Sequence, residues 1–288
     1  MVTESRAATG ATTSAPVAVS WRNSGKGVDL WWRQAVVLAV VIALYIAFRE
    51  EWIPIRMPYQ LRWEFVLRKR ELFTNGLVEA LRISLISLAI GSVIGLFCAF
   101  LRSSGNRLLA ALVTTYVELL RNVPLLLVIF IFYYGLPQAF PIGSAGREAV
   151  LTLLPTPEST FIVSLTVYAG AFLTEIFSAG VLSVSRRYLD AGRSLGLGQW
   201  TLARYITLPI MLRTVLPSLS NTFISLFKDT GIAFFIGVNE LAMAANKINT
   251  DFFRPLEGWL AAGLLYLITS WLMAAGLRFA ESRIKWSV

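Results

Sequence analysis

The stretch DAGRSLGLGQWTLARYITLP, residues 190–209, carries two glycines two positions apart, Gly196 and Gly198, among basic and hydroxyl side chains. It separates two long apolar runs of a chain in which 56% of the 288 residues are hydrophobic. Glycine releases the backbone for a sharp change of direction, and the sequence on both sides of residues 195–198 has a helical pattern. We therefore predict two short helices at an angle within residues 185–213, the second entering the membrane after Pro209.

The composition predicts a polytopic membrane protein. Only 15% of the residues are charged and the mean hydropathy is +0.64, which is outside the range of ordinary soluble domains. A helical span of the hydrocarbon layer needs about 20 largely apolar residues. Candidate spans are residues 34–48, 77–101, 108–136, 161–184, 214–238 and 258–277. The fold class is therefore an all-α membrane protein with about six transmembrane helices.

The third candidate span is interrupted at Pro124, because proline removes a backbone donor and clashes with the preceding turn. Residues 108–136 are read either as one long helix kinked at Pro124 or as a surface helix that leads into a span. Glu118 and Arg121 lie three residues apart just before the proline. Their spacing fits an intrahelical ion pair, and a functional or gating role is the alternative.

The distribution of Lys and Arg predicts that both termini are cytoplasmic, although basic residues also crowd into the outer segment 49–70. Residues 1–30 are read as a disordered cytoplasmic tail, with a targeting peptide as the alternative. Residues 31–72 hold the first span and an external interfacial segment, and residues 73–288 form the core, including the cytoplasmic loop 185–213. The net charge of +9 is explained by topology and by anionic lipids rather than by nucleic acid.

The chain lacks the side chains of most active sites. It has no histidine and one cysteine, Cys98, which excludes zinc sites with histidine ligands, histidine acid/base catalysis and cysteine clusters. It also has no phosphate-binding loop of the Walker type. We therefore expect no enzyme activity, no metal and no cofactor in this chain, and nucleotide-driven transport would require an ATPase on another polypeptide.

Residues 190–209 also carry a resemblance to a known family. Their spacing is similar to the pattern EAA-x3-G-x9-I-x-LP, the EAA loop of bacterial ABC-importer permeases. Three further blocks, VELLRNVPLLLVIFIFYYGLP (117–137), YAGAFLTEIFSAG (168–180) and LPSLSNTFISLFKDTGI (216–232), resemble the permeases for polar amino acids. The resemblance covers about residues 73–285. Asp190 replaces the usual glutamate, Gly192 replaces an alanine, and Arg187 and Tyr188 replace a Gly-Gln pair.

The resemblance implies a five-helix permease core, preceded here by one extra helix, in the bacterial inner membrane. It implies three protein partners: cytoplasmic ATPase subunits that use ATP and Mg²⁺, an external solute-binding protein, and a second permease that is identical or related. The substrate would be an amino acid moved by alternating access. A self-sufficient secondary transporter and a non-transporting scaffold are the alternative functions, and the sequence does not identify the amino acid.

Besides the structural or gating group of Glu118, Arg121 and Pro124, candidate site residues fall into two groups. Coupling to the ATPase is expected at the loop residues Asp190, Ala191, Gly192, Leu195, Gly196, Leu197, Ile206, Leu208 and Pro209. The substrate path is expected at Lys228, Asp229, Thr230, Asn221 and Glu175, because a charge inside a span is costly unless it meets a counter-charge, water or a polar ligand. Lys228 and Asp229 are adjacent on a helix and point about 100° apart, so they need not both face the path.

Overall fold

The computed structural model describes residues 59–284, together with residues 38, 39 and 42, which are helical. The chain divides into two compact units, Met1–Gln60 and Leu61–Val288. The expected tail of residues 1–30 lies outside the described residues, as does nearly all of the first expected span, residues 34–48. The second unit is helical, without β-strands among its described residues, and it contains the remaining expected spans.

Four helical segments of the described part are long and apolar enough to cross a membrane. They are α3 (Arg70–Ser103), α8 (Pro157–Leu182), the continuous run Gln199–Ile236, and α13 (Pro255–Ile284). The run Gln199–Ile236 consists of α10 (Gln199–Leu202), a π-helical turn (Ala203–Thr207), α11 (Leu208–Asp229) and a 3₁₀ segment (Thr230–Ile236). These four segments match the expected spans 77–101, 161–184, 214–238 and 258–277, and each begins earlier than the apolar run predicts.

The expected third span is two helices rather than one. The first, α4 (Arg107–Asn122), begins at Asn106, whose side chain accepts from the backbone N–H of Leu108 and Leu109. The second is α5 (Leu125–Phe130), continued by a π-helical turn (Ile131–Gly135) and α6 (Leu136–Gln138). The two parts meet at an angle of 107°, across Val123 and Pro124. The two helices together are long and apolar enough for one broken span, so the structure agrees with a break at Pro124 and is compatible with both expected forms.

Shorter helices connect the long ones. They are α2 (Glu64–Arg68), α7 (Ala145–Leu153), α9 (Arg186–Ser194) and α12 (Leu241–Phe252). Side-chain caps also mark the beginnings of α8 and α12. A capping box between Thr156 and Ser159, with Pro157 at the first helical position, starts α8, and the Glu240 carboxylate accepts from two backbone N–H groups at the start of α12.

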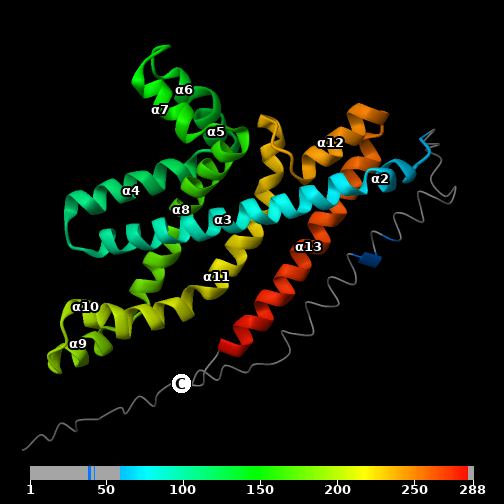
Figure 1. Ribbon diagram of the computed structural model, residues 1–288. Coiled ribbons are helices and arrows are strands. Elements are labelled where there is room, and N and C mark those ends of the chain that lie inside the picture. Colours follow the sequence, from blue (N-terminus) through cyan, green and yellow to red (C-terminus); the bar gives the residue numbers. More distant parts are fainter. Residues whose placement is uncertain (1–37, 40–41, 43–58, 285–288) are drawn as a thin grey trace, which may run out of the picture. The chain divides into compact units, whose positions relative to one another are not determined.

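Helix α8 is the centre of the second unit. It packs along α3 over a longer contact than any other described pair, and α4 and α11 lie against it as well (Figure 1). Small residues make this packing close: Gly95 of α3 lies directly against the backbone of Leu173 and Thr174 of α8. Helix α13 packs on α11 and α12 and buries little of its own surface. The core is therefore formed by α3, α8 and α11, and it leaves one face of α11 uncovered.

Candidate functional site

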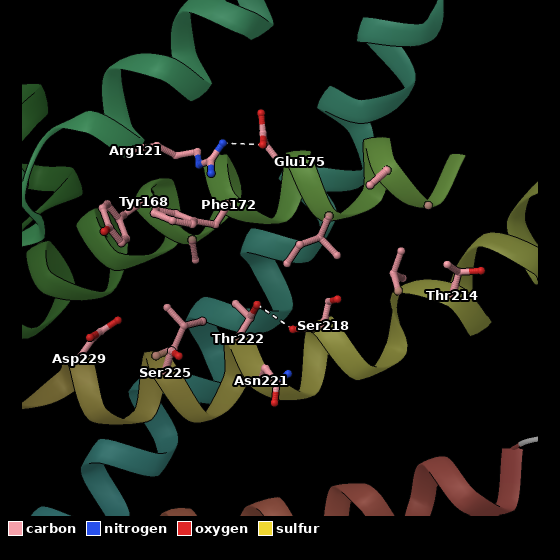
Figure 2. A pocket seen from close by; sticks show the side chains of 16 residues that line it. Arg121, Tyr168, Phe172, Glu175, Thr214, Ser218, Asn221, Thr222, Ser225 and Asp229 are labelled. Atoms are coloured by element: carbon pink, nitrogen blue, oxygen red, sulfur yellow. Dashed lines mark hydrogen bonds and ion pairs between the residues drawn. The ribbon is translucent and has the colours of Figure 1, made fainter. Parts of the chain in front are cut away.

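A cavity of about 590 Å³ lies between α8 and α11 (Figure 2). Arg121 at the end of α4 contributes to its wall. From α8 come Tyr168, Ala169, Phe172, Glu175, Ile176, Ala179 and Gly180. From α11 come Thr214, Val215, Ser218, Asn221, Thr222, Ser225, Leu226 and Asp229. The cavity follows most of the length of α11, so it has the extent of a path rather than of a compact binding pocket.

The α11 wall of this cavity is polar. We call its six polar members, Thr214, Ser218, Asn221, Thr222, Ser225 and Asp229, the α11 polar face. Apart from the adjacent pair Asn221 and Thr222, they recur at intervals of three or four residues, which places them on one side of a helix. Four of them, Thr214, Ser218, Asn221 and Ser225, are exposed. Polar groups at membrane depth are tolerated where they line water or protein, so this face requires a wet path or a second protein surface.

The opposite wall carries aromatic rings and an ion cluster. The rings of Tyr168 and Phe172 have centroids 4.9 Å apart, and the guanidinium of Arg121 lies 5.4 Å from the centroid of the Phe172 ring. Nη1 of Arg121 is 2.5 Å from Oε2 of Glu175 (Figure 2). Nη1 of Arg102, at the end of α3, is 3.6 Å from Oε1 of the same carboxylate. One carboxylate thus joins α8 to both α3 and α4.

Three of the five expected path residues line the cavity: Glu175, Asn221 and Asp229. Lys228 is exposed and is not part of the lining, because the turn between adjacent helical residues carries it away from Asp229. Thr230 is buried, and its hydroxyl donates to the backbone oxygen of Phe227. Lys228 and Thr230, two of the expected path residues, therefore do not line this cavity.

The ion pair of Arg121 also differs from the expected one. Among the described residues, Arg121 pairs with Glu175 and not with Glu118 of its own helix. Glu118 is exposed, and its backbone oxygen accepts from the side chain of Asn122. Pro124 occupies the sharp break between α4 and α5, which leaves Arg121 in the last turn of α4 beside α8. The break therefore places Arg121 at the cavity wall.

Several residues of the cavity were missed at the sequence level. The recurrence of Thr214, Ser218, Thr222 and Ser225 within an otherwise apolar span was a usable signal, because a polar face on a membrane helix requires a partner. No such signal indicated that Tyr168 and Phe172 line the cavity or that Arg102 contacts Glu175, because both depend on how the helices pack.

The glycine-punctuated loop forms the expected angled pair of helices, α9 and the beginning of the run at α10. Gly196 has φ = +77°, in the left-handed region that favours glycine, and the chain turns there. The backbone N–H of Gly196 donates to Arg193 and that of Leu197 donates to Gly192, which closes the end of α9. Ile206, Leu208 and Pro209 then lie within the uninterrupted helical run rather than before it.

The exposed apolar surface of this loop differs from the expected knob of Leu195 and Leu197. Leu195 is 80% exposed, whereas Leu197 is half-buried and packs with Leu202 and Ile206 around buried Gly192. Trp200, 78% exposed, takes the place of Leu197 at the surface. Asp190 is exposed and forms an ion pair with Arg193 over 3.0 Å, and Ala191 is exposed beside it. The loop therefore presents an indole and a leucine beside a charged pair.

A second ion cluster joins α3 to α8 near their other ends. Arg82 lies 2.6 Å from Oε1 of Glu79 on its own helix and also pairs with Glu158 at the start of α8. Both glutamates border a smaller polar cavity of about 350 Å³ that Asn239 also lines. Here one arginine lies between two glutamates, whereas at the Arg121 end one glutamate lies between two arginines. Each cluster ties the same pair of helices.

Comparison with known proteins identifies the architecture. Residues 91–286 match the family described as binding-protein-dependent transport system inner membrane component. The glutamine transport system permease protein GlnP of Escherichia coli K12 is 33% identical over 226 residues, which are 78% of this chain and 99% of that protein. The probable glutamine ABC transporter permease protein GlnM of Bacillus subtilis 168 is 32% identical over 74% of this chain and 94% of its own length.

A solved structure gives the same result. The crystal structure of an amino acid ABC transporter with histidines matches with a TM-score of 0.69 and 25% identity, over 78% of this chain and all of the matched chain. The family match, residues 91–286, includes the residues that line the cavity between α8 and α11 and the loop around Gly196. From its sequence, its helical core and these relatives, the chain belongs to the family of inner membrane permease components of binding-protein-dependent transport systems.

Proposed function

We propose that this chain is the permease subunit of an ATP-driven importer for amino acids, and that the substrate moves through the cavity between α8 and α11. The observation that carries the proposal is the α11 polar face. A helix within a membrane bundle that presents hydroxyl, amide and carboxylate groups along about 20 Å provides hydrogen-bond partners for a solute that has left water. The relatives whose printed names specify glutamine favour an amino acid over a sugar or an ion.

The α11 polar face also supports a second permease subunit. Four of its six residues are exposed in the isolated subunit, and Lys228 is exposed on the same helix. A second copy, or a related permease, placed against α11 would enclose the cavity and give these groups a polar surrounding. The path would then lie between two subunits, and Lys228 would face the partner subunit instead of the solute.

The loop around Gly196 is proposed as the contact with a cytoplasmic ATPase that binds ATP and Mg²⁺. Leu195 and Trp200 provide exposed apolar side chains of the kind that fill a partner's groove, and Asp190 and Arg193 flank them. Because α8 and α11 are continuous with α9 and α10 except at short turns, a displacement of the loop moves both walls of the cavity. Both termini of the chain are then cytoplasmic, and an external solute-binding protein delivers the amino acid.

Uptake by the reconstituted complex tests this proposal. The permease is purified with a candidate ATPase and a candidate solute-binding protein, placed in liposomes, and supplied with a panel of the twenty amino acids. The proposal predicts uptake that requires ATP inside the liposomes and the binding protein outside. Uptake driven by an ion gradient without ATP would support a secondary transporter, and no uptake with intact ATP hydrolysis would support a scaffold.

A further inference from the structure

Two guanidinium groups share one carboxylate at the α8 wall of the cavity. Oε2 of Glu175 contacts Arg121 over 2.5 Å and Oε1 lies 3.6 Å from Arg102. The three side chains are each about 35–41% exposed, so none is withdrawn into the core. Their charges sum to one excess positive charge. An anionic group that enters the cavity is therefore attracted to this wall.

Arg121 is the member of the cluster that has donors left for a ligand. A guanidinium has five N–H donors, and the ion pair with Glu175 uses Nη1. Phe172 lies against the guanidinium, which restricts its orientation. Arg121 lines the cavity and Arg102 does not. Among the described lining residues Arg121 is also the sole cation, since Lys228 is outside the lining and Asp229 has the opposite sign.

We propose that Arg121 binds the carboxylate of the transported amino acid, with Glu175 and Arg102 as the residues that position it. The inference rests on the proposed function of the cavity. A guanidinium forms parallel, charge-assisted hydrogen bonds with a carboxylate, which a neutral amide or hydroxyl matches poorly. The hydroxyl and amide groups of the α11 polar face remain for the ammonium group and the side chain.

Glu175 has a defined part in this arrangement. Its carboxylate already occupies one side of Arg121, so it competes with the carboxylate of the substrate while it holds the guanidinium at the wall. Arg102 gives Glu175 a second partner when the substrate binds. Removal of the negative charge of Glu175 is therefore expected to strengthen the binding of a carboxylate, whereas removal of the positive charge of Arg121 weakens it.

The test combines a change in the protein with a change in the ligand. The complex of permease and ATPase is placed in lipid nanodiscs without the solute-binding protein, which would select for the carboxylate by itself. Binding is measured for the amino acid that the uptake assay identifies and for its α-carboxamide; for glutamine the pair is L-glutamine and L-glutaminamide. In Arg121→Gln we expect the affinity for the acid to fall about tenfold, because one charge-assisted hydrogen bond contributes about that much to binding. We expect the affinity for the amide to change less than about twofold.

Two further variants test the direction in which the affinity for the acid changes. Glu175→Gln is expected to raise the affinity for the acid about threefold and to leave that for the amide unchanged, as one weakened competing contact would. Arg121→Lys keeps the charge but loses the planar fork, so the acid is expected to bind more weakly than to the wild type and more tightly than to Arg121→Gln. Arg107→Gln, an exposed arginine at the other end of α4, is the matched control and should change neither ligand.

The outcomes separate the inference from the proposed function. Equal losses for acid and amide in Arg121→Gln, or a loss of acid binding in Glu175→Gln, show that the cluster is only structural and overturn the inference. If Arg121→Gln does not assemble, the losses of affinity for acid and for amide are compared in Arg121→Lys instead, and equal losses again overturn the inference. A wild-type complex that neither binds nor transports any amino acid overturns the proposed function itself.

Discussion

Tyr266 of α13 donates its hydroxyl to Oε2 of Glu240 over 2.7 Å, and the same carboxylate caps α12. Its two oxygens accept from the backbone N–H groups of Ala242 and Met243. Glu240 is 1% exposed, so three hydrogen bonds replace the water that the carboxylate has lost. The pair holds the connection between α11 and α13 in place.

Burial raises the pKa of Glu240 above its ordinary value, while the hydrogen bonds to it oppose that rise. The folded protein therefore keeps a proton at a pH where the unfolded chain has lost it. Its contribution to the free energy of unfolding is complete below the ordinary glutamate pKa and is lost as the pH rises through the raised pKa. Glu240→Gln does not titrate, so we expect the thermal stability of the wild type to fall relative to this variant as the pH is raised from acid to neutral. The unfolding temperatures of wild type and Glu240→Gln are measured in detergent against pH, with the exposed Glu118→Gln as control. Parallel curves for wild type and Glu240→Gln would contradict the expectation.

The close contact of α3 with α8 predicts a strong effect of Gly95→Leu. A Cβ at residue 95 would lie 2.7 Å from Cβ of Leu173 and 2.9 Å from the backbone nitrogen of Thr174, which cannot move as a flexible side chain does. We expect a loss of several kcal/mol of stability, at the upper end of overpacking effects, seen as aggregation or a lowered unfolding temperature. Gly263→Leu on α13 is the control, since nothing lies within 4 Å of a Cβ there. Equal unfolding temperatures for the two variants would show that α3 and α8 are not packed this closely.

Gly196 sets the angle of the proposed ATPase-binding loop. Its φ of +77° costs an ordinary L-residue about 1–2 kcal/mol, while nothing within 4 Å of a Cβ would obstruct a side chain. Gly196→Ala should therefore reduce the yield of co-purified ATPase, Gly196→Trp should abolish it by adding bulk at the contact, and Gly196→Asn should reduce it least. Insertion into the membrane should be unchanged in all three. An unaltered yield of ATPase with Gly196→Trp would remove this loop from the contact.

Adjacent charges on α11 should have separable effects. Asp229 lines the cavity and Lys228 does not. We expect Asp229→Asn to lower uptake about tenfold or more if its charge meets the solute. Lys228→Met should lower uptake less, through the second permease subunit, and leave the ATPase bound. Full uptake by Asp229→Asn would show that its carboxylate has no role in the path, and loss of the whole complex in either variant would indicate a structural ion pair between subunits.

The proposed orientation can be tested by thiol labelling after Cys98 is replaced by serine. Ile142, 90% exposed in the turn between α6 and α7, is expected outside, and exposed Ser194 at the end of α9 is expected inside. A cysteine at residue 142 should react with an impermeant reagent added to whole cells. A cysteine at residue 194 should react only with a permeant reagent. The reverse labelling would place the loop around Gly196 outside and refute its contact with a cytoplasmic ATPase.

The sequence predicted local features better than tertiary ones. The glycine turn, the long apolar helices and the cavity position of Glu175, Asn221 and Asp229 follow from residue type, spacing and the cost of charge in a membrane. The partner of Arg121 is on another helix, so the nearer Glu118 was the expected one and was wrong. A step of 100° separates Lys228 from Asp229, and only the packing of α11 determines which of them faces α8.

The α11 polar face has a consequence for the fate of a subunit made alone. Lipid tails offer no hydrogen bonds, so a solitary copy would have to keep these hydroxyl and amide groups hydrated by a local defect in the bilayer, at a cost of up to several kcal/mol per unpaired group. We therefore expect a solitary copy to aggregate or to be degraded by membrane proteases. The residues responsible are the same ones that are proposed to guide the solute. The polar side of one helix thus makes the stability of this chain in a membrane depend on water or on a second polar surface.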